Sequence, residues 1–215
     1  PHFDIYFYPE ERELATYAAR MGEESFADLE RSFAHTVRRR IPLIIYSSHV
    51  HFEQTNVIPG MLPAGVAGFT EFLKGRVALP LSGSIPDFER VLRHELVHVF
   101  MFDRIRVVLR SHGISGFRSG PLWFSEGLAE YWSSEWDSYG EMILRDALFA
   151  GRLVPIRTMA RINGSFQLYK EGQSICAFMM PVIFPCLSGL HQTMPSDQMA
   201  SSRSSRTDSW SSPLT

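Results

Sequence analysis

The chain has 215 residues, of which 45% are hydrophobic and 20% are charged, a composition typical of a globular protein with one domain or one domain plus a small lobe. Its 21 basic and 23 acidic residues leave a formal net charge of -2, which argues against nucleic acid as a partner. No apolar run approaches the roughly 18 to 20 residues of a membrane span. The two cysteines, Cys176 and Cys186, lack the CxxC spacing of a zinc finger or a thioredoxin site.

The first half of the chain mixes strand and helix patterns. Strands are predicted over 2–8, 42–46 and 76–81, helices over 10–39 and 84–102, a helical turn at 51–54 and a Gly/Pro-rich loop over 60–68. Gly22 is a possible break in the first helix, and the basic run 38–40 is interpreted as its solvated C-terminal end. Pro80 predicts an edge position for the third strand, because proline cannot donate to a sheet ladder. Ser84 is the predicted N-cap of the second helix.

The second half shows helical patterns alone. After a Gly/Ser loop at 111–120, helices are predicted over 121–133, 139–149, 156–162 and 168–180. Pro181 and Pro185 are expected to break the last helix, and the Ser-rich segment 186–215 is expected to be disordered. The sequence therefore predicts an α+β fold over 1–180, with a small mixed-sheet lobe followed by a helical lobe, and a disordered tail over 181–215.

A pentapeptide in the second predicted helix, His94-Glu95-Leu96-Val97-His98, has the HExxH pattern. Residues four apart lie on one face of a helix, so both imidazoles can bind a single metal ion. The adjacent Glu95 can then point at a water on that metal. The alternative is a pair of core or surface histidines on an amphipathic helix.

A third ligand is expected from another helix, because catalytic zinc takes three protein ligands and keeps one position open. Glu126 and Glu130 lie four apart in the apolar segment 123–132. Glu126 can bind zinc while Glu130 accepts the second imidazole N–H of a ligand histidine. A solvated glutamate pair is the alternative, which the apolar setting disfavours since a buried carboxylate needs a partner.

The segments HELVHVF and LWFSEGLAEYW resemble the gluzincin zinc metallopeptidases, most closely the bacterial peptidase MA-like domains. The likeness covers roughly 1–180 and implies a zincin-like fold. It implies Zn²⁺ ligands at His94, His98 and Glu126, a general base at Glu95, and a supporting acid at Glu130. It also implies an edge strand beside the substrate cleft within Gly65–Leu81. In such families helical sequence continues, so the chain is expected to be truncated near residue 180.

The expected reaction is hydrolysis of a peptide or protein substrate. Glu95 would take a proton from a water at the zinc and pass it to the leaving amine. Tyr169 is the first candidate to stabilise the oxyanion, with Tyr131 and His112 as alternatives, although most tyrosines in apolar helices are core residues. The backbone of the predicted edge strand could pair with an extended peptide.

Two other hypotheses compete with a peptidase. The chain could be a catalytically silent, zinc-stabilised interaction module of a larger bacterial envelope protein, or a helical domain whose motif is fortuitous. The presence of Glu95 argues against a silent module, since zinc binding alone does not require it. A periplasmic or secreted location, and a place in a larger multidomain protein, are expectations from the resemblance alone.

Overall fold

The structure is a computed structural model that describes residues 1–57, 65–81, 83–116 and 119–183. The chain divides into two compact units, Pro1–Met179 and Met180–Thr215, and the site lies in the first. The predicted disorder over 186–215 falls outside the described residues. Among the helices that are described, none is long and apolar enough to cross a lipid bilayer.

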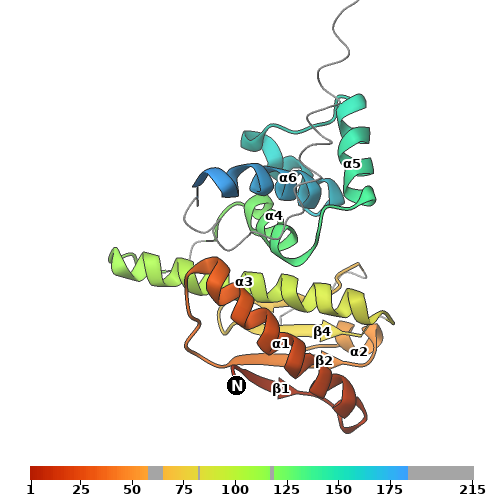
Figure 1. The fold of residues 1–215 in the computed structure, drawn as a ribbon, viewed down its shortest axis with the longest axis vertical. Helices are drawn as coiled ribbons and strands as arrows, with labels where there is room; N and C mark the ends of the chain where they lie inside the picture. Colours follow the sequence, from red (N-terminus) through yellow and green to blue (C-terminus); the bar gives the residue numbers. More distant parts are fainter. Residues whose placement is uncertain (58–64, 82, 117–118, 184–215) are drawn as a thin grey trace, which may run out of the picture. The chain divides into compact units, whose positions relative to one another are not determined.

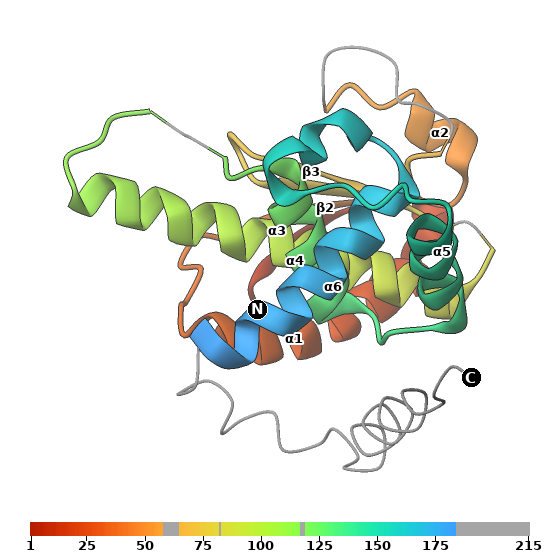
Figure 2. The ribbon, with the colours of Figure 1, turned by 90° about the horizontal axis from the view of Figure 1, so that it is seen from above.

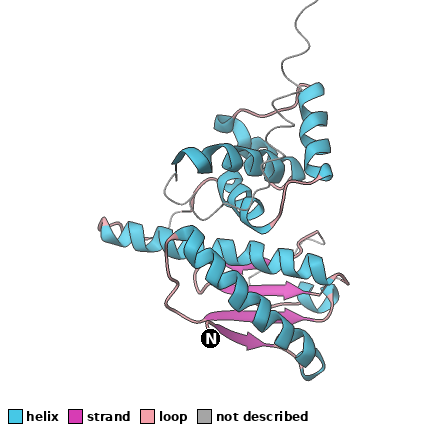
Figure 3. Ribbon diagram, viewed as in Figure 1, coloured by secondary structure: helices cyan, strands magenta, loops and turns pink. Residues whose placement is uncertain are grey.

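A four-stranded mixed sheet forms one layer of the first unit (Figures 1 and 3). The order is β1 (Phe3–Tyr6), β2 (Ile41–Tyr46), β4 (Arg76–Pro80) and β3 (Phe69–Glu71). The first three strands of this order are parallel, and β3 runs antiparallel to β4. A mixed sheet followed by helices confirms the predicted α+β class.

Strand register gives the sheet two different faces. The pairs Leu43↔Val77 and Ile45↔Leu79 share one face, whereas Ile44 pairs with Ala78 on the other. Helices α1 (Arg12–Phe33) and α3 (Ile85–Ser111) cover the first face (Figure 1). The short helix α2 (His49–Glu53) covers the second, where its Phe52 packs in a cluster with Tyr46 and Ala78.

The predicted edge strand over 76–81 is wrong, because β4 lies inside the sheet between β2 and β3. Pro80 is tolerated there since β3 is short. Its pairing with β4 covers only Arg76 to Ala78, so no β3 residue opposes Pro80. The edge beside α3 is instead β3, which the sequence pattern did not identify as a separate strand.

The first long helix ends earlier than predicted. A 3-10 turn η1 (Pro9–Glu11) precedes α1, which stops at Phe33 because Ala34 adopts a left-handed conformation with φ 44°. Gly22 does not break α1. It instead leaves room for the ring of Phe3, which a methyl group at that position would approach to 3.1 Å.

The basic run at 38–40 is therefore not a helix end, which corrects the sequence interpretation. It lies in the connection between α1 and β2. Arg39 donates to the Lys74 carbonyl, and Arg40 pairs with Asp4 at 2.5 Å. Arg39 and Arg40 thus tie the connection to other parts of the chain, while Arg38 and Arg40 are exposed, as expected of a solvated run.

The helix that carries HExxH begins as predicted, where the Ser84 hydroxyl accepts from the Asp87 N–H at 3.3 Å. It continues to Ser111, nine residues past the predicted end at 102. Gly113, with φ 68°, follows its C-cap. The extension has no helix breaker before that glycine, which explains why the exposed second half stays helical.

The remaining helices are α4 (Leu122–Ser133), α5 (Ser138–Phe149), the 3-10 helix η2 (Ile156–Ile162) and α6 (Phe166–Ile183). Helix α6 crosses over α4 in the view from above (Figure 2). Their backbones touch at two glycines, since a methyl group at Gly127 would lie 2.3 Å from the Gly172 carbonyl carbon. The predicted break at Pro181 is wrong by a few residues, because a proline in the last turn removes only one helical hydrogen bond.

Candidate metal centre

The two histidines of HExxH lie side by side on the buried half of α3. Their ring centroids are 5.0 Å apart, and His94 and His98 are 8% and 6% exposed. Apolar neighbours Leu92, Leu96 and Val99 bury the opposite surface of the helix. The amphipathic pattern of α3 therefore turns both imidazoles toward α4.

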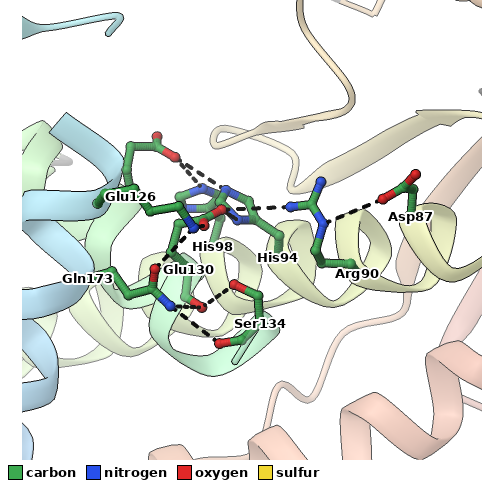
Figure 4. A network of polar contacts seen from close by, with 9 residues as sticks. Asp87, Arg90, His94, His98, Glu126, Glu130, Ser134 and Gln173 are labelled. Carbon is green, nitrogen blue, oxygen red and sulfur yellow. Dashed lines mark hydrogen bonds and ion pairs between the residues drawn. The ribbon is translucent and has the colours of Figure 1, made fainter. Parts of the chain in front are cut away.

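Glu126 of α4 faces both rings (Figure 4). Its Oε2 lies 3.2 Å from His94 Nε2 and 3.4 Å from His98 Nε2. The three ligand atoms lie within 4.8 Å of one another, a grouping that could hold a metal ion. The structure thus brings together the three predicted ligands from two helices, with both imidazoles presenting the same ring nitrogen.

The ionisable side chains of this group shift the pKa values of one another. Burial opposes protonation of His94, but the carboxylates of Glu126 and Glu130 outweigh it and raise the pKa of His94 to about 9. Burial likewise opposes ionisation of Glu126, yet its hydrogen bonds to His94 and His98 lower the pKa of Glu126 to about 2. Protonated His94 therefore lies against the carboxylates of Glu126 and Glu130.

The donor set fits zinc. Two imidazole nitrogens and one carboxylate oxygen form the three-ligand set of catalytic zinc sites, which leaves a fourth position for water or substrate. On α3, the outer nitrogen of His98, Nδ1, is buried and has no hydrogen-bond partner among the described residues. The outer nitrogen of His94, in contrast, has a carboxylate beside it.

That carboxylate belongs to Glu130. Its Oε1 lies 3.3 Å from His94 Nδ1, close enough for an ion pair but without the angle of a hydrogen bond. Its Oε2 accepts a hydrogen bond from Lys170 Nζ at 2.7 Å. Burial opposes ionisation of Glu130, but His94 and Lys170 lower the pKa of Glu130 to about 2. Glu130 therefore stays anionic beside the His94 ring, although the predicted hydrogen bond from the second imidazole N–H is not formed.

A polar network extends from Glu130 into the neighbouring helices (Figure 4). Arg90 Nη1 lies 3.8 Å from Glu130 Oε1, on the same helix as the two histidines. Gln173 Oε1 accepts from Lys170 at 3.1 Å, and Gln173 Nε2 donates to the Ser134 carbonyl at 3.3 Å. Sequence reasoning missed Lys170 and Arg90. A lysine near the start of a largely apolar helix was the one available signal.

Of the three candidates for oxyanion stabilisation, the structure places Tyr169 at the cluster. Its ring stacks on His94 with centroids 6.4 Å apart. Burial raises the pKa of Tyr169, and Glu126, Glu95 and Glu130 raise it further, so its hydroxyl stays protonated close to all three acids.

The other two candidates lie elsewhere. Burial and Cys176 raise the pKa of Tyr131, which places that tyrosine against α6 beside the thiol. His112 is the C-cap of α3, fourteen residues beyond His98. At about 1.5 Å per residue, that separation is about 21 Å along the helix.

Glu95, the predicted general base, is buried and 5% exposed. Its Oε2 accepts a hydrogen bond from Thr70 Oγ1 at 2.7 Å. Thr70 lies on β3, a strand that sequence reasoning did not separate from its loop. The Glu95 carboxylate is thus bonded from the sheet, whereas His94, His98 and Glu126 meet between α3 and α4.

A scan against protein-family models and a search of curated proteins give no match to this chain. The chemistry of the site is therefore inferred from its own donor set, burial and hydrogen bonds.

Proposed function

We propose that this chain is a zinc-dependent peptidase with a zincin-like fold, related to the gluzincins. One observation carries the proposal: a single oxygen of Glu126 faces Nε2 of both His94 and His98, at 3.2 Å and 3.4 Å. Two imidazoles and one carboxylate, converging from two helices, form a ligand set that zinc prefers. His94, His98 and Glu126 would hold the metal.

Bound zinc would supply Lewis-acid polarisation of the scissile carbonyl and would lower the pKa of a water to about 7. The residues of the chain do the rest. Glu95 takes the proton of the attacking water and delivers it to the leaving amine. Tyr169, protonated and stacked on His94, donates a hydrogen bond to the oxyanion. Glu130 fixes the orientation of the His94 ring from behind.

The substrate is proposed to be an extended peptide that adds to the outer edge of β3. Main-chain hydrogen bonds to a sheet edge recognise a peptide without demanding a particular sequence. Strand β3 is at the end of the described sheet and contacts α3, the helix that carries Glu95. A periplasmic or secreted location and a larger multidomain protein stay predictions from the sequence resemblance.

The test combines metal analysis with turnover. Purified protein is loaded with Zn²⁺, its zinc content is measured, and it is incubated with a quenched-fluorescent peptide library. Wild type should bind one zinc ion per chain and cleave peptides. Glu95→Gln should keep the zinc and lose at least about a hundredfold in rate, since general-base catalysis contributes about 10²–10⁴-fold.

Glu13→Gln is the matched control, because Glu13 is exposed on α1 and should leave both readouts unchanged. Full cleavage by Glu95→Gln would refute the assigned base. Bound zinc with no cleavage of the library by wild type would favour the silent interaction module instead.

A further inference from the structure

Strand β3 runs beside α3 in a fixed register. Gly68 comes directly before β3, two residues before Thr70, and Val91 and Glu95 are four residues apart on one face of α3. Two residues of a strand span about 6.6 Å and four residues of a helix span about 6 Å, so the spacings of the two pairs match. A methyl group at Gly68 would lie 2.8 Å from Val91 Cγ1 and 2.6 Å from Leu79 Cδ2. Gly68 therefore allows the chain entering β3 to approach α3 closely.

The same register brings the Thr70 hydroxyl to Glu95. Thr70 Oγ1 lies 2.7 Å from Glu95 Oε2 and 3.0 Å from the Glu95 carbonyl oxygen. A hydroxyl has one proton to donate, and an ionised carboxylate is the stronger acceptor. The shorter of the two distances is also the one to the carboxylate. Thr70 thus donates to Oε2 of Glu95, and no hydrogen bond or ion pair to Oε1 is found among the residues that the structure describes.

The position of Thr70 is held from the opposite face of the strand. Its neighbour Phe69 points to the other side of the sheet, where it packs against the Phe52 ring at a centroid distance of 5.6 Å. Thr70 itself is paired with Val77 of β4. The hydroxyl therefore belongs to a packed strand with little freedom to move away from Glu95.

We propose that Thr70 is a positioning residue that fixes the carboxylate of Glu95 through Oε2, so that its other oxygen is ready to take the proton of the attacking water. This inference rests on the proposed peptidase function. It also gives β3 two tasks, since the strand proposed to receive the peptide is the strand that orients the base. Misplacement of a catalytic group by about 1 Å can cost about a hundredfold in rate. Loss of the Thr70 hydroxyl is therefore expected to slow the reaction.

The test compares Thr70→Val, which keeps the shape and removes the hydroxyl, with Thr70→Ser, which keeps the hydroxyl. On zinc-loaded protein with a quenched-fluorescent decapeptide, Thr70→Val should lower kcat by roughly tenfold to a hundredfold with KM changed by less than about threefold. Zinc content should stay at one ion per chain. Thr70→Ser should stay within about threefold of wild type, because its hydroxyl can still donate to Glu95.

Thr158→Val is the matched control, since the Thr158 hydroxyl donates to the Pro155 carbonyl at an exposed position. It should behave as wild type. Wild-type kcat in Thr70→Val, or equal losses in Thr70→Val and Thr70→Ser, would overturn the inference. If Thr70→Val does not fold, Thr70→Ala takes its place with the same expected loss.

A second readout separates this inference from the peptidase proposal. Crystal structures of wild type and Thr70→Val, with and without zinc, report where the Glu95 carboxylate lies. The inference expects one Glu95 rotamer, bonded to Thr70, in wild type and a different or divided rotamer in the variant. An unmoved Glu95 in Thr70→Val would overturn it. If wild type cleaves nothing but Glu95 moves as expected, the peptidase proposal alone fails.

Discussion

The two sides of α3 bury very different groups. Toward α1, the fully buried Phe100 packs edge-on against Phe26 with ring centroids 4.9 Å apart and stacks with Phe33 at 5.6 Å. Toward α4, the same helix buries His94 and His98 against acidic side chains. The first contact removes apolar surface from water and stabilises the fold directly. The second is costly unless each charge finds a partner, and a buried ion pair is weak evidence for stability.

The difference between an apolar and a charged buried side indicates that the function of α3 lies on its α4 side. A helix that needed only to pack could have used leucine on both sides, with no loss of stability. The α4 side of α3 carries instead two imidazoles, which are buried against the carboxylates of Glu126 and Glu130. The two sides should therefore respond to substitution in opposite ways: the α1 side through folding, the α4 side through metal binding.

The largest effect is expected on the apolar side. Phe100→Ala should lower the free energy of unfolding by about 3–5 kcal/mol, because it removes a fully buried ring and leaves a cavity. Urea unfolding of the metal-free protein measures this. Phe178, 79% exposed on α6, offers the matched control, and Phe178→Ala should cost less than about 0.5 kcal/mol. Zinc stoichiometry should stay at one in both. If Phe100→Ala lost zinc but kept its free energy of unfolding, the expectation that the α1 side of α3 acts through folding would be wrong.

On the charged side, Glu126→Ala should weaken zinc binding by more than about a hundredfold, which corresponds to about 2.8 kcal/mol at 1.4 kcal/mol per factor of ten. The variant loses the one carboxylate oxygen that faces both histidines. Competition with a fluorescent chelator measures the affinity. Glu141→Ala, at an exposed position on α5, serves as control. Equal zinc affinities in the two variants would show that Glu126 is not a ligand.

Zinc removal should lower the free energy of unfolding of wild type by an amount similar to the loss of binding free energy expected for Glu126→Ala. Free zinc at 100 times its Kd stabilises a folded protein by about 2.7 kcal/mol through mass action. Thermal unfolding with zinc and with excess chelator should therefore give a higher Tm for the zinc-loaded wild type. Glu126→Ala should show little difference between the two conditions. No shift of Tm in wild type would support a fortuitous motif.

The smallest effect on zinc affinity is expected at Lys170, which contacts Glu130 and not a proposed zinc ligand. Lys170→Met should weaken zinc binding by roughly tenfold to a hundredfold, because Glu130 loses its 2.7 Å partner and no longer holds His94 in place. Lys74→Met is the natural control, since Lys74 is the other lysine of the chain and is exposed. If Lys170→Met reduces stability but leaves zinc affinity unchanged, Lys170 serves packing alone.

Much of the charged side could be predicted from sequence. The i, i+4 spacing of His94 and His98 fixes their shared face, and the same spacing puts Glu126 and Glu130 on one face of their helix. These relations depend only on helix geometry, so they hold even where the predicted ends of the helices and strands are wrong. The structure places Glu126 beside Nε2 and Glu130 beside Nδ1 of the His94 ring, an assignment that the family resemblance implied and that spacing alone did not give.

The contacts that cross between distant elements could not be predicted in the same way. Thr70 reaches Glu95 through a three-residue strand that follows a Gly/Pro-rich loop, too short to show an alternating pattern. Lys170 reaches Glu130 because two glycines allow α6 to touch α4, a relation without a sequence period. The end of α1 at Ala34 could not be predicted either, because the residue with the left-handed conformation there is an alanine and not a glycine.

X-ray absorption at the zinc K-edge of protein loaded with one equivalent of Zn²⁺ tests the central claim most directly. The account predicts two imidazole ligands and one carboxylate in the wild-type spectrum, with the carboxylate lost in Glu126→Ala and one imidazole lost in His98→Ala. A zinc ion without imidazole ligands, or a spectrum that none of these substitutions changes, would contradict it.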